Sequence, residues 1–179
     1  MQTETDLRYP LGKFHRPGPL GDEQRREFTG DIEKLPARLR EAVKNLAPAQ
    51  IETPYRPGGW TVRQLVHHVA DSHMNAYVRL KLTLTEDQPT IKPYAEAKWA
   101  ELKDSKAEPV EVSLALLDNL HRRWVTVLRA MTPGEFSRNM RHPDWEKPMS
   151  LDDALALYAW HGKHHVAHIT SLREREGWR

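Results

Sequence analysis

Four stretches of this sequence repeat apolar residues at intervals of three and four, and this spacing is the strongest constraint on its fold. It places the apolar side chains on one face of an α-helix, and that face must pack against a partner. No stretch shows the alternation of apolar and polar residues that predicts strands. The sequence therefore predicts an all-α fold, a four-helix bundle. The expected helices cover about 22–46, 61–84, 114–131 and 150–177.

Capping residues mark the start of two of these helices. Thr61 is followed three positions later by Gln64, and Ser150 by Asp153, which is the spacing of a capping box. In a capping box each side chain bonds to the other residue's backbone N–H, so free donors at the helix start are satisfied. Gly177 is the expected end of the last helix, since glycine readily adopts the left-handed conformation that closes a helix.

The connections suggest a bundle with additions. Segments 85–110 and 132–149 are longer than the roughly two to eight residues usual between neighbouring bundle helices, and predict overhand crossovers or an added lobe. Residues 1–21 contain three prolines and three glycines, a mixture that disfavours a helix and predicts an extended arm. At 179 residues the chain is expected to form one domain, 1–179.

The composition excludes several kinds of site and partner. With no cysteine, the chain has no disulfide and no thiolate ligand, so any metal must be bound through nitrogen or oxygen. The net charge is only +2 and the basic residues are spread among acidic ones, which argues against a nucleic-acid partner. No apolar run suits a membrane span or a signal peptide, so we expect no membrane partner and a cytoplasmic location.

Seven of the ten histidines fall in two short segments, HHVADSH at 67–73 and HGKHHVAH at 161–168. His161 and His165 are one helical turn apart, in the row that Leu172 and other apolar residues place toward the core. Residues four apart on a helix have Cβ atoms about 6 Å apart, so both imidazoles can reach one metal ion. Such a pair also occurs by chance in helical proteins, and a buried histidine is usually a packed, hydrogen-bonded residue.

A third ligand can come from the second helix. His68 shares a face with Ser72, Asn75 and Arg79, and that face is polar where bundle interiors are usually apolar. His67 points about 100° away and is a poorer candidate. We therefore predict one divalent metal ion bound by His68, His161 and His165.

The other histidines are expected to play lesser roles. His164 and His168 repeat the four-residue spacing but are rotated about 60° from the first pair, so they are outward, support the ligands, or are solvated. His121 lies in an apolar row and is expected to pack in the core or line a pocket. We expect His73 and His142 at surface or loop positions.

Three segments, TPYRPGGWTVRQLVHHVADSHMNAYVRLKL, KPYAEAKWAELKDS and LALYAWHGKHHVAHIT, carry a resemblance that extends over nearly the whole chain. With the arm sequence DLRYPLGKF, they resemble the DinB superfamily and, within it, the YfiT-like candidate metal-dependent hydrolases. In that family one histidine of the second helix and an HxxxH pair of the last helix bind the metal, which by position are His68, His161 and His165. The resemblance further implies a cytoplasmic homodimer and one ion per subunit, zinc first and nickel as the alternative.

Three functions are compatible with such a centre. Three neutral imidazoles leave a coordination position open, and a zinc-type ion lowers the pKa of bound water from 15.7 to about 7, which predicts hydrolysis of a small ester or amide. The same ion could deliver a small-molecule thiol to an electrophile, as the resemblance implies for relatives that use bacillithiol or mycothiol. The third is a non-catalytic, stress-related metal-binding module, which a fourth protein ligand would favour.

Three further polar residues on the second helix complete the expected site. Asp71 could orient His67, His68 or a water molecule and is a candidate general base, although a solvated carboxylate is the plainer interpretation. Asn75 and Arg79 lie about two and three turns along the His68 face and are predicted to line the substrate pocket, with Arg79 holding an anionic group.

Overall fold

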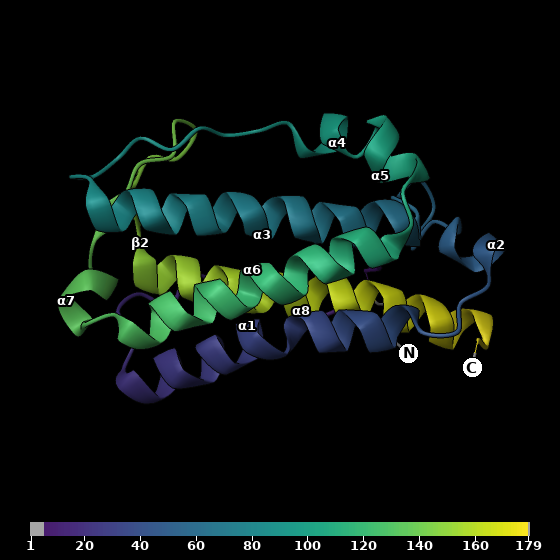
Figure 1. The fold of residues 1–179 in the computed structure, drawn as a ribbon, viewed down its shortest axis with the longest axis horizontal. Helices are drawn as coiled ribbons and strands as arrows, with labels where there is room; N and C mark the ends of the chain where they lie inside the picture. The colour runs from purple at the N-terminus through teal and green to yellow at the C-terminus, as the bar shows by residue number, and fades with distance from the viewer. Residues whose placement is uncertain (1–5, 179) are drawn as a thin grey trace.

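The computed structural model describes residues 6–178 and consists mainly of four long helices (Figure 1), which confirms the predicted all-α bundle. These are α1 (Asp22–Val43), α3 (Val62–Thr85), α6 (Val110–Ala130) and α8 (Leu151–Glu176). The shorter elements are α2 (Pro48–Ile51), α4 (Glu96–Trp99), α5 (Lys103–Ala107), α7 (Pro133–Phe136), β1 (Asn139–Met140) and β2 (Met149–Ser150). The first five residues of the expected arm lie outside the described residues, and 6–21 contain no helix.

Both predicted capping boxes are present. The Thr61 hydroxyl accepts from the Gln64 N–H at 3.2 Å, and the Thr61 N–H donates to the Gln64 side chain at 3.0 Å. Ser150 and Asp153 bond in the same reciprocal way at the start of α8. Gly177 ends α8 in the left-handed conformation, with φ of 66°. Local side-chain chemistry therefore defines the ends of the helices that carry the clustered histidines.

Each long helix packs against two others. Helix α1 contacts α8 and α6, and α3 contacts the same two helices, so α1 and α3 occupy opposite corners of the bundle (Figure 1). The connection between α1 and α3 contains α2 and lies at one end of the bundle. Segment 86–109, with α4 and α5, returns along the outside of α3, so α6 starts at the same end as α3 and runs parallel to it (Figure 1). Of the two alternatives that its length predicted, this segment is the overhand crossover.

The second long connection, 132–149, contains α7 and a short hairpin. Strands β1 and β2 pair antiparallel, with Asn139 opposite Ser150 and Met140 opposite Met149. Two-residue strands are too short to produce a recognisable alternation, which is why the sequence pattern gave no sign of them.

None of the described helices combines the length and hydropathy needed to cross a bilayer.

The apolar core is divided into two clusters along the bundle axis. One contains Trp124 and Leu155, and the other contains Val66 and Leu117. Between these clusters α3, α6 and α8 all turn histidines inward, so the middle of the bundle is a polar layer. Buried rings of this kind need hydrogen-bond partners or a metal ion to offset lost hydration. The layer contains His73, His121, His161 and His165.

A close contact between α1 and α8 lies beside this layer. A Cβ atom added to Gly162 would lie 2.5 Å from a methyl carbon of Leu35. Glycine therefore leaves room for the Leu35 side chain of α1 against α8 at the residue that follows His161, and any larger residue requires Leu35 to move. The helix pair is also joined at its other end, where the buried Asp152 carboxylate accepts two bonds from the Arg25 guanidinium, each of 2.8 Å.

Candidate metal centre

The structure brings His68, His161 and His165 together from two helices that are far apart in sequence. One ring nitrogen from each lies within 4.8 Å of the others, and the two Nε2 atoms of His161 and His165 are 3.2 Å apart. Within residues 6–178 no further histidine, aspartate or glutamate joins this group. We call these three residues the three-histidine cluster. Helix α3 supplies one ring and two consecutive turns of α8 supply the others.

All three rings of the cluster are neutral near pH 7 because desolvation disfavours their charged forms, although His161 is only partly buried. His68 and His165 are each 8% exposed. Burial lowers the pKa of His68 to about 4, and it holds the pKa values of His161 and His165 well below the usual range, with the neighbouring rings adding to the effect. A neutral imidazole has the free lone pair that a metal ion requires, so protonation does not block this site at pH 7.

The geometry and the donor set fit a divalent ion. Two nitrogens bound at 2.0–2.1 Å to a tetrahedral ion lie about 3.3 Å apart, close to the observed separation of the His161 and His165 Nε2 atoms. The buried Nδ1 of His165 has no partner in the described structure. Three nitrogen donors suit zinc or nickel, whereas magnesium and calcium prefer oxygen.

His73 corrects one expectation from the sequence. We expected it at a surface or loop position, but its side chain is 0% exposed. Its Nε2 lies 3.1 Å from Nδ1 of His161, and its Nδ1 lies 3.0 Å from Nε2 of His121. Because α6 and α8 both pack on α3, that helix is buried over a wider face than one stripe suggests. The signal was available, since His73 continues the row of spacing three and four formed by Val66, Val69, Ala76 and Leu80.

The second pair, His164 and His168, faces the arm. Both side chains are buried, so the solvated alternative is wrong. The His164 ring lies 6.2 Å from the ring of Tyr9, and the His168 ring stacks on Tyr55 at 4.1 Å. Nε2–H of His168 donates to the carbonyl of Arg8 at 3.2 Å. The arm and the loop before α3 therefore cover this face of α8.

His67 and Asp71 lie on either side of His68 in sequence but differ in their surroundings. His67 turns toward α6, with its ring nitrogens 2.7 Å from the Ser113 hydroxyl and 3.0 Å from the carbonyl of Glu108. Asp71 is half-buried, and burial, with a smaller contribution from the charge of Asp104, raises its pKa to about 6. Within residues 6–178 no hydrogen bond joins the Asp71 carboxylate to a histidine ring. Its pKa suits proton transfer near neutral pH.

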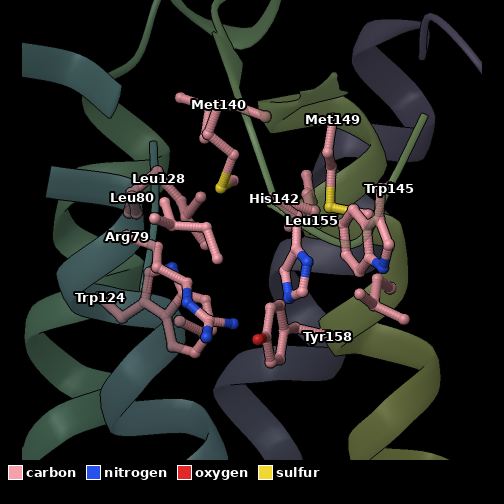
Figure 2. Close-up of a pocket in the computed structure, with 15 residues that line it drawn as sticks. Arg79, Leu80, Trp124, Leu128, Met140, His142, Trp145, Met149, Leu155 and Tyr158 are labelled. Carbon is pink, nitrogen blue, oxygen red and sulfur yellow. The ribbon is translucent and has the colours of Figure 1, made fainter. Parts of the chain in front are cut away.

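A pocket next to the histidine layer contains Arg79 and Tyr158 (Figure 2). The guanidinium group and the phenol hydroxyl face one another across it, and His142 lies beside them. Tyr158 also contacts the cluster, because its ring centroid is 5.8 Å from that of His161. The phenol ring thus lies between the pocket and the cluster. Most of the remaining lining is apolar, including Leu80, Trp124, Leu128, Met140, Met149 and Leu155.

Asn75 and Arg79, both predicted to line the pocket, have different positions. Arg79 lines it and donates a hydrogen bond to the carbonyl of Lys92 at 3.0 Å. Asn75 is not among the lining residues, and its amide donates to the backbone carbonyl of Asp71 at 2.8 Å. Of these two residues on the His68 face of α3, only Arg79 therefore lines this pocket.

Comparison with known proteins places this geometry in a family. Residues 31–169 match the model of the DinB superfamily. A Bacillus mycoides protein named "Putative metal-dependent hydrolase" is 55% identical over 173 residues, which are 97% of this chain and 99% of that protein. YfiT of Bacillus subtilis, which bears the same description, is 49% identical over 98% of this chain and 99% of its own length.

A solved structure gives the same result. The structure of YfiT from Bacillus subtilis superposes with a TM-score of 0.95 at 50% identity, covering 97% of this chain and 99% of that one. It is described as a probable metal-dependent hydrolase with an unusual four-helix bundle topology, and the diagonal placement of α1 and α3 shows such a topology here. The family match and the two close relatives, together with the bundle, establish that this chain belongs to the DinB superfamily and is a YfiT-like protein.

Proposed function

We propose that this protein is a divalent-metal-dependent hydrolase of a small-molecule substrate, with the ion bound by His68, His161 and His165. The observation that carries the proposal is the convergence of three neutral imidazoles, two buried and one partly buried, with no fourth protein ligand among residues 6–178. Zinc is the ion we favour, and nickel is the alternative. The names of the close relatives support the same class of activity.

A set of three ligands favours catalysis over a purely structural role. Structural zinc sites are usually closed by four protein ligands, whereas catalytic sites keep one position for water or substrate. A zinc-type ion held in this way supplies Lewis acidity and a water whose pKa is lowered to about 7. The chain contributes the fixed arrangement of its rings, which are already neutral and need not lose a proton before binding the ion.

Three other side chains have defined parts in this proposal. Asp71, whose pKa of about 6 leaves it mostly ionised at pH 7, is the candidate to accept a proton during the reaction. Arg79 binds an anionic group of the substrate, and the apolar side chains of the same pocket bind its carbon skeleton. Tyr158, lying between the pocket and His161, orients the substrate toward the cluster. We further propose that the protein is cytoplasmic and acts as a homodimer. Equilibrium sedimentation would measure the oligomeric state.

Parallel assays of the zinc-loaded protein would test the reaction. One arm contains model esters and amides, and the other contains bacillithiol or a similar thiol with an electrophile. We expect turnover in the first arm and its loss in His161→Ala, while His164→Ala should stay active because its side chain faces the arm. Turnover only in the second arm would identify a thiol transferase. Stoichiometric zinc binding with no turnover in either arm would identify a non-catalytic metal-binding module.

A further inference from the structure

Three histidines from three helices form a continuous hydrogen-bonded row across the middle of the bundle. Nδ1 of His121 lies 2.6 Å from the carbonyl oxygen of Ile32 in α1. Nε2 of His121 lies 3.0 Å from Nδ1 of His73, and Nε2 of His73 lies 3.1 Å from Nδ1 of His161. We call His121, His73 and His161 the histidine chain. It begins at a backbone carbonyl and ends at a member of the three-histidine cluster.

The carbonyl at one end determines the direction of every bond in the histidine chain. A carbonyl oxygen can only accept, so Nδ1 of His121 carries the hydrogen and its Nε2 is a free acceptor. His73 must then donate through Nδ1–H, which leaves its own Nε2 to accept from Nδ1–H of His161. The last ring thus keeps its lone pair on Nε2, the nitrogen that faces His165 at 3.2 Å.

This assignment requires neutral rings, and their surroundings favour that state. The side chains of His73 and His121 are 0% and 1% exposed. Within residues 6–178 no carboxylate forms a hydrogen bond with either ring. A buried imidazolium without such a partner is strongly disfavoured. With one hydrogen on each ring, only the Nδ1–H tautomer at all three positions satisfies every hydrogen bond of the histidine chain.

We infer that His73 and His121 are positioning residues that hold His161 as the Nδ1–H tautomer, with its Nε2 lone pair directed at the metal centre. This inference rests on the proposed function. A metal-binding histidine commonly donates its other ring N–H to a fixed acceptor, and here that acceptor is a second histidine held by a third. His165 differs, because its Nδ1 has no partner in the described structure. Only one member of the pair is therefore oriented in this way.

The tautomers can be measured directly in the metal-free wild-type protein. Long-range proton–nitrogen correlation spectra of protein labelled with ¹⁵N-histidine distinguish Nδ1–H from Nε2–H rings, and single-histidine variants assign the signals. We expect the Nδ1–H form for all three members of the histidine chain. An Nε2–H ring at His161 or His73 would overturn the inference. The tautomers are read in the wild-type protein, and the result holds whether or not the protein hydrolyses a substrate.

Zinc affinity tests the consequence of the arrangement. His73→Phe fills the buried space but removes the acceptor for His161, and we expect zinc to bind about 10- to 100-fold more weakly in competition with a chelator. His73→Gln places an amide oxygen near the former Nε2 position, so it should recover most of that loss. His67→Phe is the matched control, since it also removes a buried histidine from α3 but lies toward Ser113.

The outcomes separate this inference from the proposed function. Wild-type zinc affinity in a folded His73→Phe variant would refute a positioning role, whatever the reaction. An equal loss in His73→Phe and His67→Phe would also refute it, since it would indicate general destabilisation of α3. If the wild-type protein bound no zinc, the proposed metal centre would fail. In that case the tautomer of His161 would still show whether the hydrogen-bond directions in the histidine chain are correctly assigned.

Discussion

Helix α8 carries two histidine pairs with the same four-residue spacing, and the structure gives them different surroundings. His161 and His165 meet His68 of α3. His164 and His168 instead meet aromatic rings from the arm and from the loop before α3. His164, His165 and His168 are buried and His161 is partly buried, so burial and spacing do not distinguish the two pairs. The difference shows that an HxxxH pair becomes a candidate metal site only when another element supplies a third ligand.

The largest expected effect comes from removing one ligand of the first pair. His161→Ala should abolish stoichiometric zinc binding, because two remaining imidazoles cannot hold the ion at the same affinity. His164→Ala is the matched change in the second pair and should bind one zinc per subunit. Metal analysis after exhaustive dialysis measures both. Full occupancy in the first variant, or loss of zinc in the second, would reverse the roles assigned to the two pairs.

The next effect concerns Gly162, the residue that follows His161 of the first pair. Gly162→Ala places a methyl group 2.5 Å from Leu35, and we expect it to lower the free energy of unfolding by about 1–3 kcal/mol. It should also weaken zinc binding, since Leu35 or α8 must move to make room beside His161. Gly30→Ala is the control, because a Cβ there meets nothing within 4 Å and alanine favours the helix. Equal stability of the two variants in urea denaturation would show that the α1–α8 contact is not tight.

Acid should destabilise the metal-free protein through its buried histidines. Burial lowers the pKa of His121 to about 4, below the usual 6.5, so between these values the unfolded chain binds more protons than the folded one. Stability must therefore fall as pH decreases from 6.5 to 4, by roughly 1.4 kcal/mol per pH unit for one such group. His121→Asn retains a donor for Ile32 and removes the titrating ring, so its stability should fall less steeply. Identical pH profiles for wild type and variant would contradict the assignment.

The smallest effect is expected where the arm covers the second pair. Tyr9→Ala removes the ring beside His164 and should cost about 1 kcal/mol of stability. Zinc affinity should stay within about twofold of wild type, since zinc coordination needs none of the second-pair nitrogens. Thermal denaturation and chelator competition measure the two quantities. A large loss of zinc affinity would mean that the arm acts on the cluster as well.

The sequence predicted much of the helical framework because that information is local. Thr61 and Ser150 mark the starts of α3 and α8 through hydrogen bonds to a residue three positions later. Gly177 ends α8 through its left-handed backbone conformation. The diagonal placement of α1 and α3 depends instead on contacts between distant segments. Periodicity reports which face of a helix is buried, but not which helix covers it.

In the candidate site too, local sequence patterns predicted some residues, whereas contacts between distant segments were not predictable. The phase of His161 and His165 and the polar face of α3 were enough to select the residues that the structure brings together. The prediction for His73 was wrong because it rested on the His68 face of α3 alone, whereas α6 and α8 also bury the side that carries His73. The carbonyl of Ile32 that orders the histidine chain is a backbone group, and no residue type could have signalled its position.

The most direct test of the central claim is a crystal structure of the zinc-loaded protein with anomalous scattering recorded at the zinc edge. We predict one anomalous peak per subunit, about 2.0–2.1 Å from a ring nitrogen of each of His68, His161 and His165. The open position should hold no fourth protein ligand. A peak bound by His164 and His168, or no peak near α8 in a fully zinc-loaded crystal, would contradict the account.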